Sequence, residues 1–140
     1  MELQVGVKIA IFREGKVLLL KRAGGKYSDI KQDRWDIVGG RINPGTPLTE
    51  NLKREVLEET KMQVVETPLL IAAQDILKSP DKHVVRLTFL GEASGEPVLD
   101  SENEEYQWMG LKDLLDLGEN LDIYFKELLD NPAIIKKLKN

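Results

Sequence analysis

Three glutamates and one arginine stand close together in the segment Arg54-Glu55-Val56-Leu57-Glu58-Glu59. Residues i, i+3 and i+4 of an α-helix lie on one face, so a helix here groups the carboxylates of Glu55, Glu58 and Glu59. Such like charges repel each other by ~0.2–0.5 kcal/mol per pair unless a cation neutralises them. Mg²⁺ prefers carboxylate oxygens and usually binds together with phosphate, so the segment indicates a divalent-cation site. The alternative is a solvated acidic helix face.

The segment before this helix, Trp35 to Leu48, favours the metal site. A short apolar run enters the pair Gly39-Gly40, and a turn rich in Asn, Pro and Gly follows. Glycine permits close backbone approach, so a carbonyl here can point at an ion, although the pair alone also fits an ordinary tight turn. Thr46 is a good N-cap and Pro47 suits the first helical position, so we expect the helix to begin there. The expected buried stripe of the helix is Leu48, Leu52, Val56 and Met62.

From Gly40 to Met62 the sequence resembles the box of the Nudix hydrolase family. The box is written G-x5-E-x7-R-E-U-x-E-E-x-G-U, where U is a bulky aliphatic residue. Gly40, the segment Arg54 to Glu59 and Met62 align with it without a gap. Chance agreement over so many spaced positions is improbable, and the resemblance implies a metal-dependent hydrolase.

Two positions depart from the family pattern, because Thr46 stands in place of Glu and Lys61 in place of Gly. The family's Glu supports the arginine, so we expect Arg54 to be held less firmly here, a kind of loss that often costs ~10–100-fold in activity. Lys61 is less suited than Gly to a left-handed turn, at a cost of roughly 1 kcal/mol unless the helix runs on by one residue. Neither change removes an expected metal ligand, so we expect an active site.

The resemblance implies a role for each matching residue. Glu58 and Glu59 would bind the cation, with the Gly39 carbonyl as a further ligand, and Glu55 would be a ligand or the general base. Arg54 would orient the carboxylates. Mg²⁺ is the implied cofactor and Mn²⁺ its alternative. Hydrolysis of a phosphoanhydride needs neutralised phosphate charge and a positioned water, which Mg²⁺ and carboxylates supply.

A second acidic cluster spans Asp100 to Glu105, just before the aromatic run at Tyr106. The family often places one more metal-binding glutamate in such a loop, and we expect it to be Glu102, with Glu105 as the alternative. An acidic surface loop without a ligand is the competing interpretation. Trp108 is expected in the core or the pocket wall.

Several cationic and aromatic residues are candidates for substrate contact. Arg22, at the end of an expected strand, matches a position where relatives frequently bind phosphate through arginine. Tyr27 would stack on a base or cover the sheet edge. We expect further cationic side chains near the entrance of the site, namely Lys26, Lys31, Arg34 and Arg41. The alternative interpretation of each is an ordinary solvated surface charge.

The resemblance also implies the substrate class, a nucleoside diphosphate linked to another group. A compact chain suits nucleoside triphosphates, including oxidised ones, and dinucleoside polyphosphates come next. Two other classes stay open. The chain would be a non-catalytic nucleotide-binding module if Thr46 and Lys61 impair turnover, or the acidic helix would be a protein-interaction surface that no metal affects.

Composition agrees with a soluble enzyme of one domain, residues 1–140. The absence of cysteine excludes a disulfide scaffold and zinc-thiolate sites, and the single histidine, His83, argues against a histidine-based triad. No signal peptide or membrane span is visible, so we expect a cytoplasmic protein. The net charge of −4 argues against a stable nucleic-acid complex. Among homo-oligomers, a homodimer is the commonest assembly.

Hydrophobic periodicity predicts a mixed order of strands and helices. Alternating apolar residues predict strands at 5–12, 17–22, 63–77, 83–92 and 106–109. Helical spacing is found at 111–117, 121–129 and 132–138, and a loop is expected at 23–33. Strands flanked by helices predict a layered α/β fold. The resemblance makes this the Nudix fold, an α/β/α sandwich around a mixed β-sheet.

Overall fold

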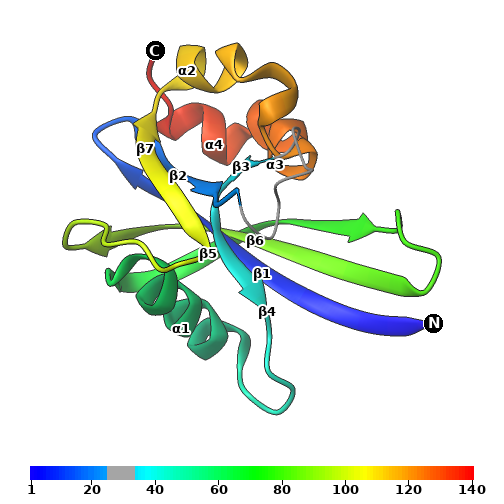
Figure 1. Ribbon diagram of the computed structural model, residues 1–140. Coiled ribbons are helices and arrows are strands. Elements are labelled where there is room, and N and C mark those ends of the chain that lie inside the picture. Colours follow the sequence, from blue (N-terminus) through cyan, green and yellow to red (C-terminus); the bar gives the residue numbers. More distant parts are fainter. Residues whose placement is uncertain (25–33) are drawn as a thin grey trace.

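The computed structural model describes residues 1–24 and 34–140, and the strands in these ranges form one seven-stranded mixed sheet (Figure 1). The main path through the sheet is β3-β2-β1-β6-β5, with β4 alongside β1 and β7 alongside β2. The strands are β1 (Glu2–Arg13), β2 (Lys16–Arg22), β3 (Trp35–Asp36), β4 (Val38–Arg41), β5 (Gln63–Ile76), β6 (Lys82–Ser94) and β7 (Asn103–Met109).

Strand β1 is the centre of the sheet and sets the register at the site. It runs parallel to β6 over nearly its whole length, from the pair Glu2 and Lys82 to the pair Ile11 and Gly91. Its other edge pairs antiparallel first with β4 and then with β2. Within the β4 pairing Lys8 lies opposite Gly39. The central strand therefore carries a lysine beside the glycine pair that the sequence analysis singled out.

Helices cover both faces of the sheet, as Figure 1 shows, so the predicted α/β/α sandwich is confirmed. Helix α1 (Leu48–Thr60) lies on one face. The other face carries α2 (Leu111–Asp116), α3 (Ile123–Glu127) and α4 (Pro132–Lys137), together with 3₁₀ turns at Gly118–Asn120 and Leu128–Asp130.

Successive apolar residues of one strand are buried on opposite faces of the sheet, which explains why helices cover both faces. In β2, Leu18 packs in the core cluster beneath α1, whereas the next residue, Leu19, packs in the cluster with Phe125 of α3. Both leucines are fully buried. A strand buried on both faces has a continuous apolar run instead of strict alternation, as Val17 to Leu20 does.

Helix α1 begins one residue later than predicted. Pro47 occupies the cap position and makes no side-chain cap bond, so the prediction of Thr46 as N-cap is wrong. The reason is a turn in which the Thr46 N–H donates to the Asn43 carbonyl at 3.1 Å, which places Thr46 before the helix. Leu48 is 37% exposed and does not belong to the buried stripe, whereas Leu52, Val56 and Met62 do.

The end of α1 keeps the left-handed turn of the family pattern despite the lysine. Lys61 has φ 61° and ψ 10°, and its N–H donates to the Leu57 carbonyl at 3.0 Å. The helix does not run on by one residue, so Lys61 has the strained conformation that glycine would adopt more easily.

Other element boundaries differ from the prediction in informative ways. Strands β3 and β4 were not predicted, because segments of two and four residues are too short to show a period. The helix expected at 121–129 is a shorter helix, Ile123–Glu127, followed by a 3₁₀ turn. Strand β7 begins at Asn103 and so includes part of the acidic cluster.

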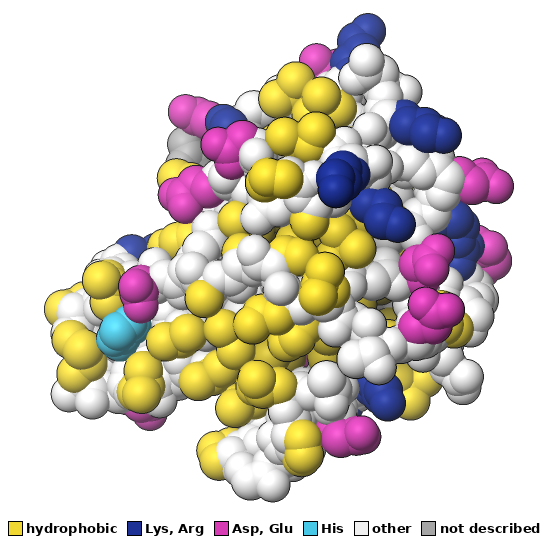
Figure 2. Space-filling model, turned by 180° about the vertical axis from the view of Figure 1, so that it is seen from behind, with side chains coloured by type: hydrophobic (Ala, Val, Ile, Leu, Met, Phe, Trp, Pro, Cys, Tyr) yellow, Lys and Arg dark blue, Asp and Glu magenta, His cyan; other side chains and the backbone are white. Residues whose placement is uncertain are grey.

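Seen from behind, hydrophobic side chains gather across the molecule (Figure 2). Exposed large hydrophobic residues include Val65, Leu69 and Leu70 of β5, the last strand in the sheet order. An exposed apolar edge strand can pair with another strand, but the homodimer stays a prediction. Among the described helices, none is both long and apolar enough to span a lipid bilayer.

Candidate active site

A cavity of about 610 Å³ runs across the sheet from α1 to the start of α3. Residues of β1, β4 and β6 form its floor, α1 supplies carboxylates at one end, and Asp122 and Tyr124 lie at the other. The structure brings most of the predicted site residues together on this cavity. They are Arg22, Gly39, Arg41, Glu55, Glu58, Glu59 and Glu102.

Close packing of β4 against β1 and α1 explains the two glycines. The Gly39 N–H donates to Glu59 Oε1 at 2.8 Å, and Gly39 has φ 145°, which side-chain-bearing residues rarely adopt. A Cβ on Gly39 would lie 2.0 Å from the Val7 carbonyl oxygen, and one on Gly40 would lie 2.7 Å from Glu55 Oε2. Position 39 therefore requires glycine because of the neighbouring backbone of β1, whereas a side chain at position 40 would displace the Glu55 carboxylate.

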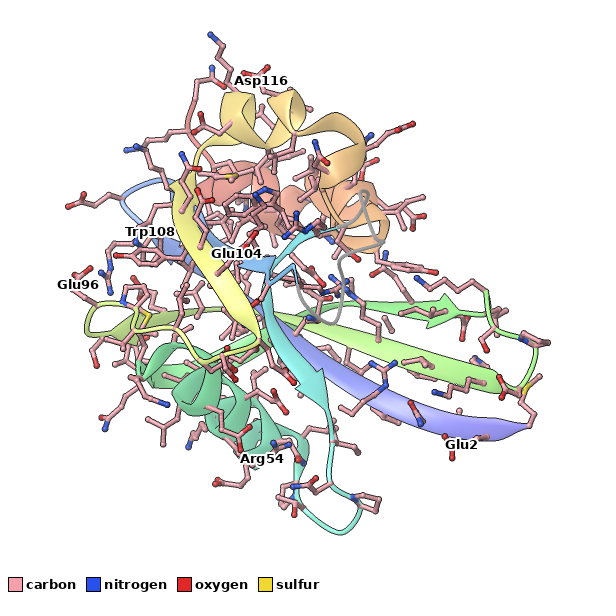
Figure 3. The ribbon with its side chains drawn as sticks, viewed as in Figure 1. Glu2, Arg54, Glu96, Glu104, Trp108 and Asp116 are labelled. Carbon is pink, nitrogen blue, oxygen red and sulfur yellow. The ribbon has the colours of Figure 1, made fainter. Side chains whose placement is uncertain are left out.

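Arg54, labelled in Figure 3, donates hydrogen bonds to two of the helix carboxylates. Its Nη1 donates to Glu55 Oε1 at 2.9 Å and to Glu58 Oε2 at 3.4 Å. Its Nη2 donates to Asn51 Oδ1 at 3.0 Å and to the Arg41 carbonyl at 3.2 Å. The Nε of Arg54 is buried and has no hydrogen-bond partner among the described residues. In the family pattern, a Glu at position 46 would support this guanidinium group.

Asn51 is a structural residue of the site that the sequence analysis missed. It is fully buried, and its Oδ1 also accepts from the Asn43 N–H at 2.8 Å. Its Nδ2 donates to the carbonyls of Thr46 and Pro47 at 2.8 and 2.9 Å. One amide therefore fixes the turn before α1 and also holds Arg54, which partly replaces the missing glutamate. Its position three residues before Arg54 was the only available signal.

Burial changes the acidity of two of the helix carboxylates. Burial raises the pKa of Glu59 to about 7, against the opposing effects of the Lys8 ammonium and the Gly39 N–H. Burial also raises the pKa of Glu55, while Arg54 acts to lower it. A desolvated carboxylate gains most from a nearby cation, so both residues are suited to ligating a metal ion.

A second group of charged residues lines the cavity, and of its members only Arg22 was predicted. Asp36, Arg86 and Asp122 are all buried. Arg86 donates to Asp36 Oδ1 at 3.0 Å and to Asp36 Oδ2 at 3.1 Å, and its Nη1 lies 3.2 Å from Asp122 Oδ2. Two cations complete the group, because Lys8 Nζ lies 3.1 Å and Arg22 Nη2 3.7 Å from Asp36 Oδ2. We call these five residues the buried charge cluster.

The pKa values of the two carboxylates in this cluster are shifted in opposite directions. Burial alone would raise the pKa of Asp36, but Lys8 and Arg86 hold it well below its usual range. Burial and the charge of Asp36 raise the pKa of Asp122, whose Oδ2 also accepts from the Phe125 N–H and caps α3. The cavity therefore has an acidic end at α1 and a mixed end that offers both carboxylate and guanidinium groups.

Some predicted residues lie elsewhere. Arg34 donates to the Arg22 carbonyl and to Glu104 Oε1, both at 2.6 Å, and it does not belong to the described cavity lining. Glu104, labelled in Figure 3, also lies 3.5 Å from Lys21 Nζ. Glu105 does not line the described cavity. The residues predicted for substrate contact that fall outside the described ranges are Lys26, Tyr27 and Lys31.

Two further residues behave as packing or surface groups. Trp108 is half-buried against the core beneath α1, and the Arg13 guanidinium lies 4.7 Å from its ring centroid. His83 lies near the start of β6, where its Nε2 is 2.7 Å from Asp75 Oδ1. Neither residue lines the described cavity.

The donor chemistry at the acidic end fits Mg²⁺. Carboxylate oxygens of Glu55, Glu58 and Glu59 share one cavity with Gly39, and hard divalent cations prefer such oxygen ligands. Within residues 1–24 and 34–140, no three acidic, histidine or cysteine side chains are already gathered tightly enough to hold an ion. The three glutamates form hydrogen bonds within the protein: Arg54 donates to Glu55 and Glu58, and the Gly39 N–H donates to Glu59.

Comparison with known proteins agrees with the motif and the fold. A family model described as the NUDIX domain matches residues 2–129. A MutT NUDIX hydrolase from Burkholderia pseudomallei is 25% identical, with a TM-score of 0.76, and the match covers 94% of this chain and 99% of that one. The MutT protein from Methanosarcina mazei Go1 is 27% identical, with a TM-score of 0.77 and coverage of 96% and 94%.

A more distant likeness supports the fold alone. The ORF135 protein of E. coli is 20% identical, with a TM-score of 0.76 and coverage of 97% of this chain and 92% of that one. No curated protein matches. Because the NUDIX model spans most of the chain and the helix carboxylates lie on one cavity, this chain belongs to the NUDIX family and is a Nudix-type pyrophosphohydrolase.

Proposed function

We propose that this chain hydrolyses a phosphoanhydride bond of a nucleoside triphosphate, ordinary or oxidised, with Mg²⁺ as its cofactor and Mn²⁺ as a substitute. The observation that carries the proposal is the shared cavity, which has Glu55, Glu58 and Glu59 at one end and the buried charge cluster at the other. A polyphosphate chain needs the cation at the first end, and a nucleoside needs polar recognition groups at the second.

Each residue at the acidic end has a distinct task in this proposal. Glu58, Glu59 and the Gly39 carbonyl hold the cation, with Glu102 as a further ligand across the cavity. When bound there, the cation would neutralise charge on the phosphate oxygens. Glu55 takes the proton of the attacking water, and its raised pKa brings it nearer to neutral pH, where a general base works best. Arg54 keeps Glu55 and Glu58 in position.

The residues at the other end of the cavity favour a nucleoside as the group attached to the polyphosphate chain. Asp122 and Asp36 offer acceptors, Arg86 offers donors, and Tyr124 offers an aromatic face beside them. Arg22 of this cluster and Arg41 of β4 also line the cavity, where they can pair with phosphate oxygens. Arg34, which donates to Glu104, and Tyr27 stay as proposals for substrate contact.

The proposal is tested by phosphate and pyrophosphate release from a nucleotide panel, in Mg²⁺, in Mn²⁺ and in excess chelator. The panel contains ordinary and oxidised nucleoside triphosphates, dinucleoside polyphosphates, nucleotide sugars and ADP-ribose. Metal-dependent release that is fastest with a nucleoside triphosphate is expected. Preference for a dinucleoside polyphosphate would replace the substrate proposal and leave the metal-dependent chemistry standing.

A nucleotide-binding module without turnover is the second candidate, favoured by one observation. The buried Nε of Arg54 has no partner among the described residues, so the arginine lacks part of the support that the family's Glu gives. This alternative would be established if calorimetry detects nucleotide binding while no nucleotide of the panel releases phosphate or pyrophosphate with either metal.

A further inference from the structure

Lys8 is the one lysine of β1, and its side chain connects the two ends of the cavity. Its Nζ lies 3.1 Å from Asp36 Oδ2, 3.2 Å from the Ile37 carbonyl oxygen and 3.3 Å from the Gly39 carbonyl oxygen. An ammonium group has three N–H donors, and here each has one acceptor. The side chain is only 15% exposed, so the charge is held in place rather than solvated.

The Lys8 ammonium lies next to a group that the proposed function assigns to the metal. Its acceptor on β4 is the carbonyl of Gly39, the same group that the proposed function assigns to the metal. Two cations close to one carbonyl in a poorly solvated site repel each other strongly.

We propose that Lys8 competes with the divalent cation for the Gly39 carbonyl. The inference rests on the proposed metal-dependent function. Without a bound cation, Lys8 stabilises the backbone beside α1 through the carbonyls of Ile37 and Gly39. When a divalent cation binds, Asp36 is the partner that keeps the ammonium in the buried charge cluster. Lys8 is thus a positioning residue that lowers the affinity of the free site for metal.

The competing view is that Lys8 only supports the structure. Its side chain also packs across Gly39, since a Cβ there would lie 2.9 Å from Lys8 Cδ. If that packing were its whole role, removal of the charge with the side-chain length kept would leave the metal affinity unchanged. The two views therefore predict different results, tighter metal binding or no change.

The test measures the dissociation constant of Mn²⁺ and of Mg²⁺, without nucleotide, by calorimetry and by Mn²⁺ electron paramagnetic resonance. Lys8→Met keeps the length of the side chain and removes its charge. Lys8→Gln is the second variant, because its amide can still donate to a carbonyl. Lys82→Met is the matched control, since Lys82 lines the same cavity but forms no described bond to Gly39. Measurements at about pH 8.5, above the pKa of Glu59, limit competition by protons.

We expect about tenfold tighter metal binding in both Lys8 variants and no comparable change in Lys82→Met. In excess chelator the Lys8 variants should melt at a lower temperature than the wild type, and added Mg²⁺ should raise their Tm by more. Unchanged or weaker binding in both variants overturns the inference, and so does equal tightening in Lys82→Met. Absence of metal binding by the wild type would overturn the proposed function too, so the two failures are distinguishable.

Discussion

The carboxylate of Glu59 accepts a hydrogen bond from the backbone N–H of Gly39 at 2.8 Å, and this bond ties α1 to β4. The same two residues carry a carboxylate and a carbonyl that the proposed function assigns to one cation. Strand and helix are thus held together at the place where the metal is proposed to bind.

Gly40→Ala should reduce activity without a matching loss of stability. The added Cβ would lie 2.7 Å from Glu55 Oε2, and the end of a glutamate side chain can move away at little cost. We expect kcat to fall by about 10–100-fold, as for a misplaced catalytic group, and Tm to change little. Gly24→Ala is the control, because a Cβ there meets nothing within 4 Å. A variant with wild-type kcat would show that the position of Glu55 is not critical.

Thr46→Glu should raise activity or metal affinity. It restores the family's residue beside Arg54, whose Nε has no partner among the described residues. Asn51 already holds the guanidinium, so we expect a gain of only about threefold, below the usual range for such support. Steady-state kinetics over a range of Mg²⁺ concentrations would measure it. Thr46→Gln, which adds length without charge, should gain less, and equal effects of the two would exclude an ion pair as the cause.

Lys61→Gly should stabilise the protein by about 0.5–1 kcal/mol, because glycine adopts the left-handed turn after α1 without the steric cost that lysine bears. Urea unfolding measures the change in free energy. Lys61→Ala keeps the Cβ and loses only the weak bond to the Glu58 carbonyl, so it should show no gain. Equal stabilisation by alanine and glycine would contradict the conformational explanation.

Asp36→Asn should weaken the acid sensitivity of the fold. Lys8 and Arg86 hold the pKa of Asp36 well below its usual range despite burial. A lowered folded-state pKa contributes stability above the unfolded value of about 3.9, and that stability is lost as the pH falls below it. The free energy of unfolding of the wild type should therefore decrease from about pH 4 downward, and the variant should lose this slope.

The same variant should be less stable at neutral pH by about 3 kcal/mol or more, because it leaves buried cations without their carboxylate. Urea unfolding at a series of pH values measures both effects. Asp116→Asn, on the exposed side of α2, is the control and should keep the wild-type slope. If the free energy of unfolding of Asp36→Asn still decreases below about pH 4 as it does in the wild type, other carboxylates cause the acid sensitivity.

Local sequence pattern was sufficient for the acidic half of the site and not for the other half. The spacing of Glu55, Glu58 and Glu59 within one helix determines that they share a face, and the family resemblance supplied Gly39. Asp36 and Arg86, in contrast, are 50 residues apart in the sequence and meet only because the strands of the sheet bring them together. Each of them, seen in the sequence, has the appearance of an ordinary surface charge.

The same distinction explains the errors at the start of α1. Capping preferences favoured Thr46, but the buried Asn51 amide and the bond to the Asn43 carbonyl determine where the turn ends. Strands β3 and β4 are defined by pairing with β2 and β1 rather than by their own residues. Specific hydrogen bonds within the turn decided the first case, and tertiary strand pairing decided the second.

The central claim is that the α1 carboxylates carry metal-dependent hydrolysis, and Glu58→Gln tests it most directly. Glu58 lines the cavity, is 57% exposed and contacts Arg54, so its neutral isostere should preserve the fold. Glu50→Gln makes the same chemical change in the first turn of the same helix, away from the cavity lining. The measurement is Mg²⁺-dependent turnover of the best nucleotide of the panel. We predict a fall in kcat of more than about 100-fold in Glu58→Gln and less than about twofold in Glu50→Gln. Unchanged kcat in Glu58→Gln would contradict the metal assignment.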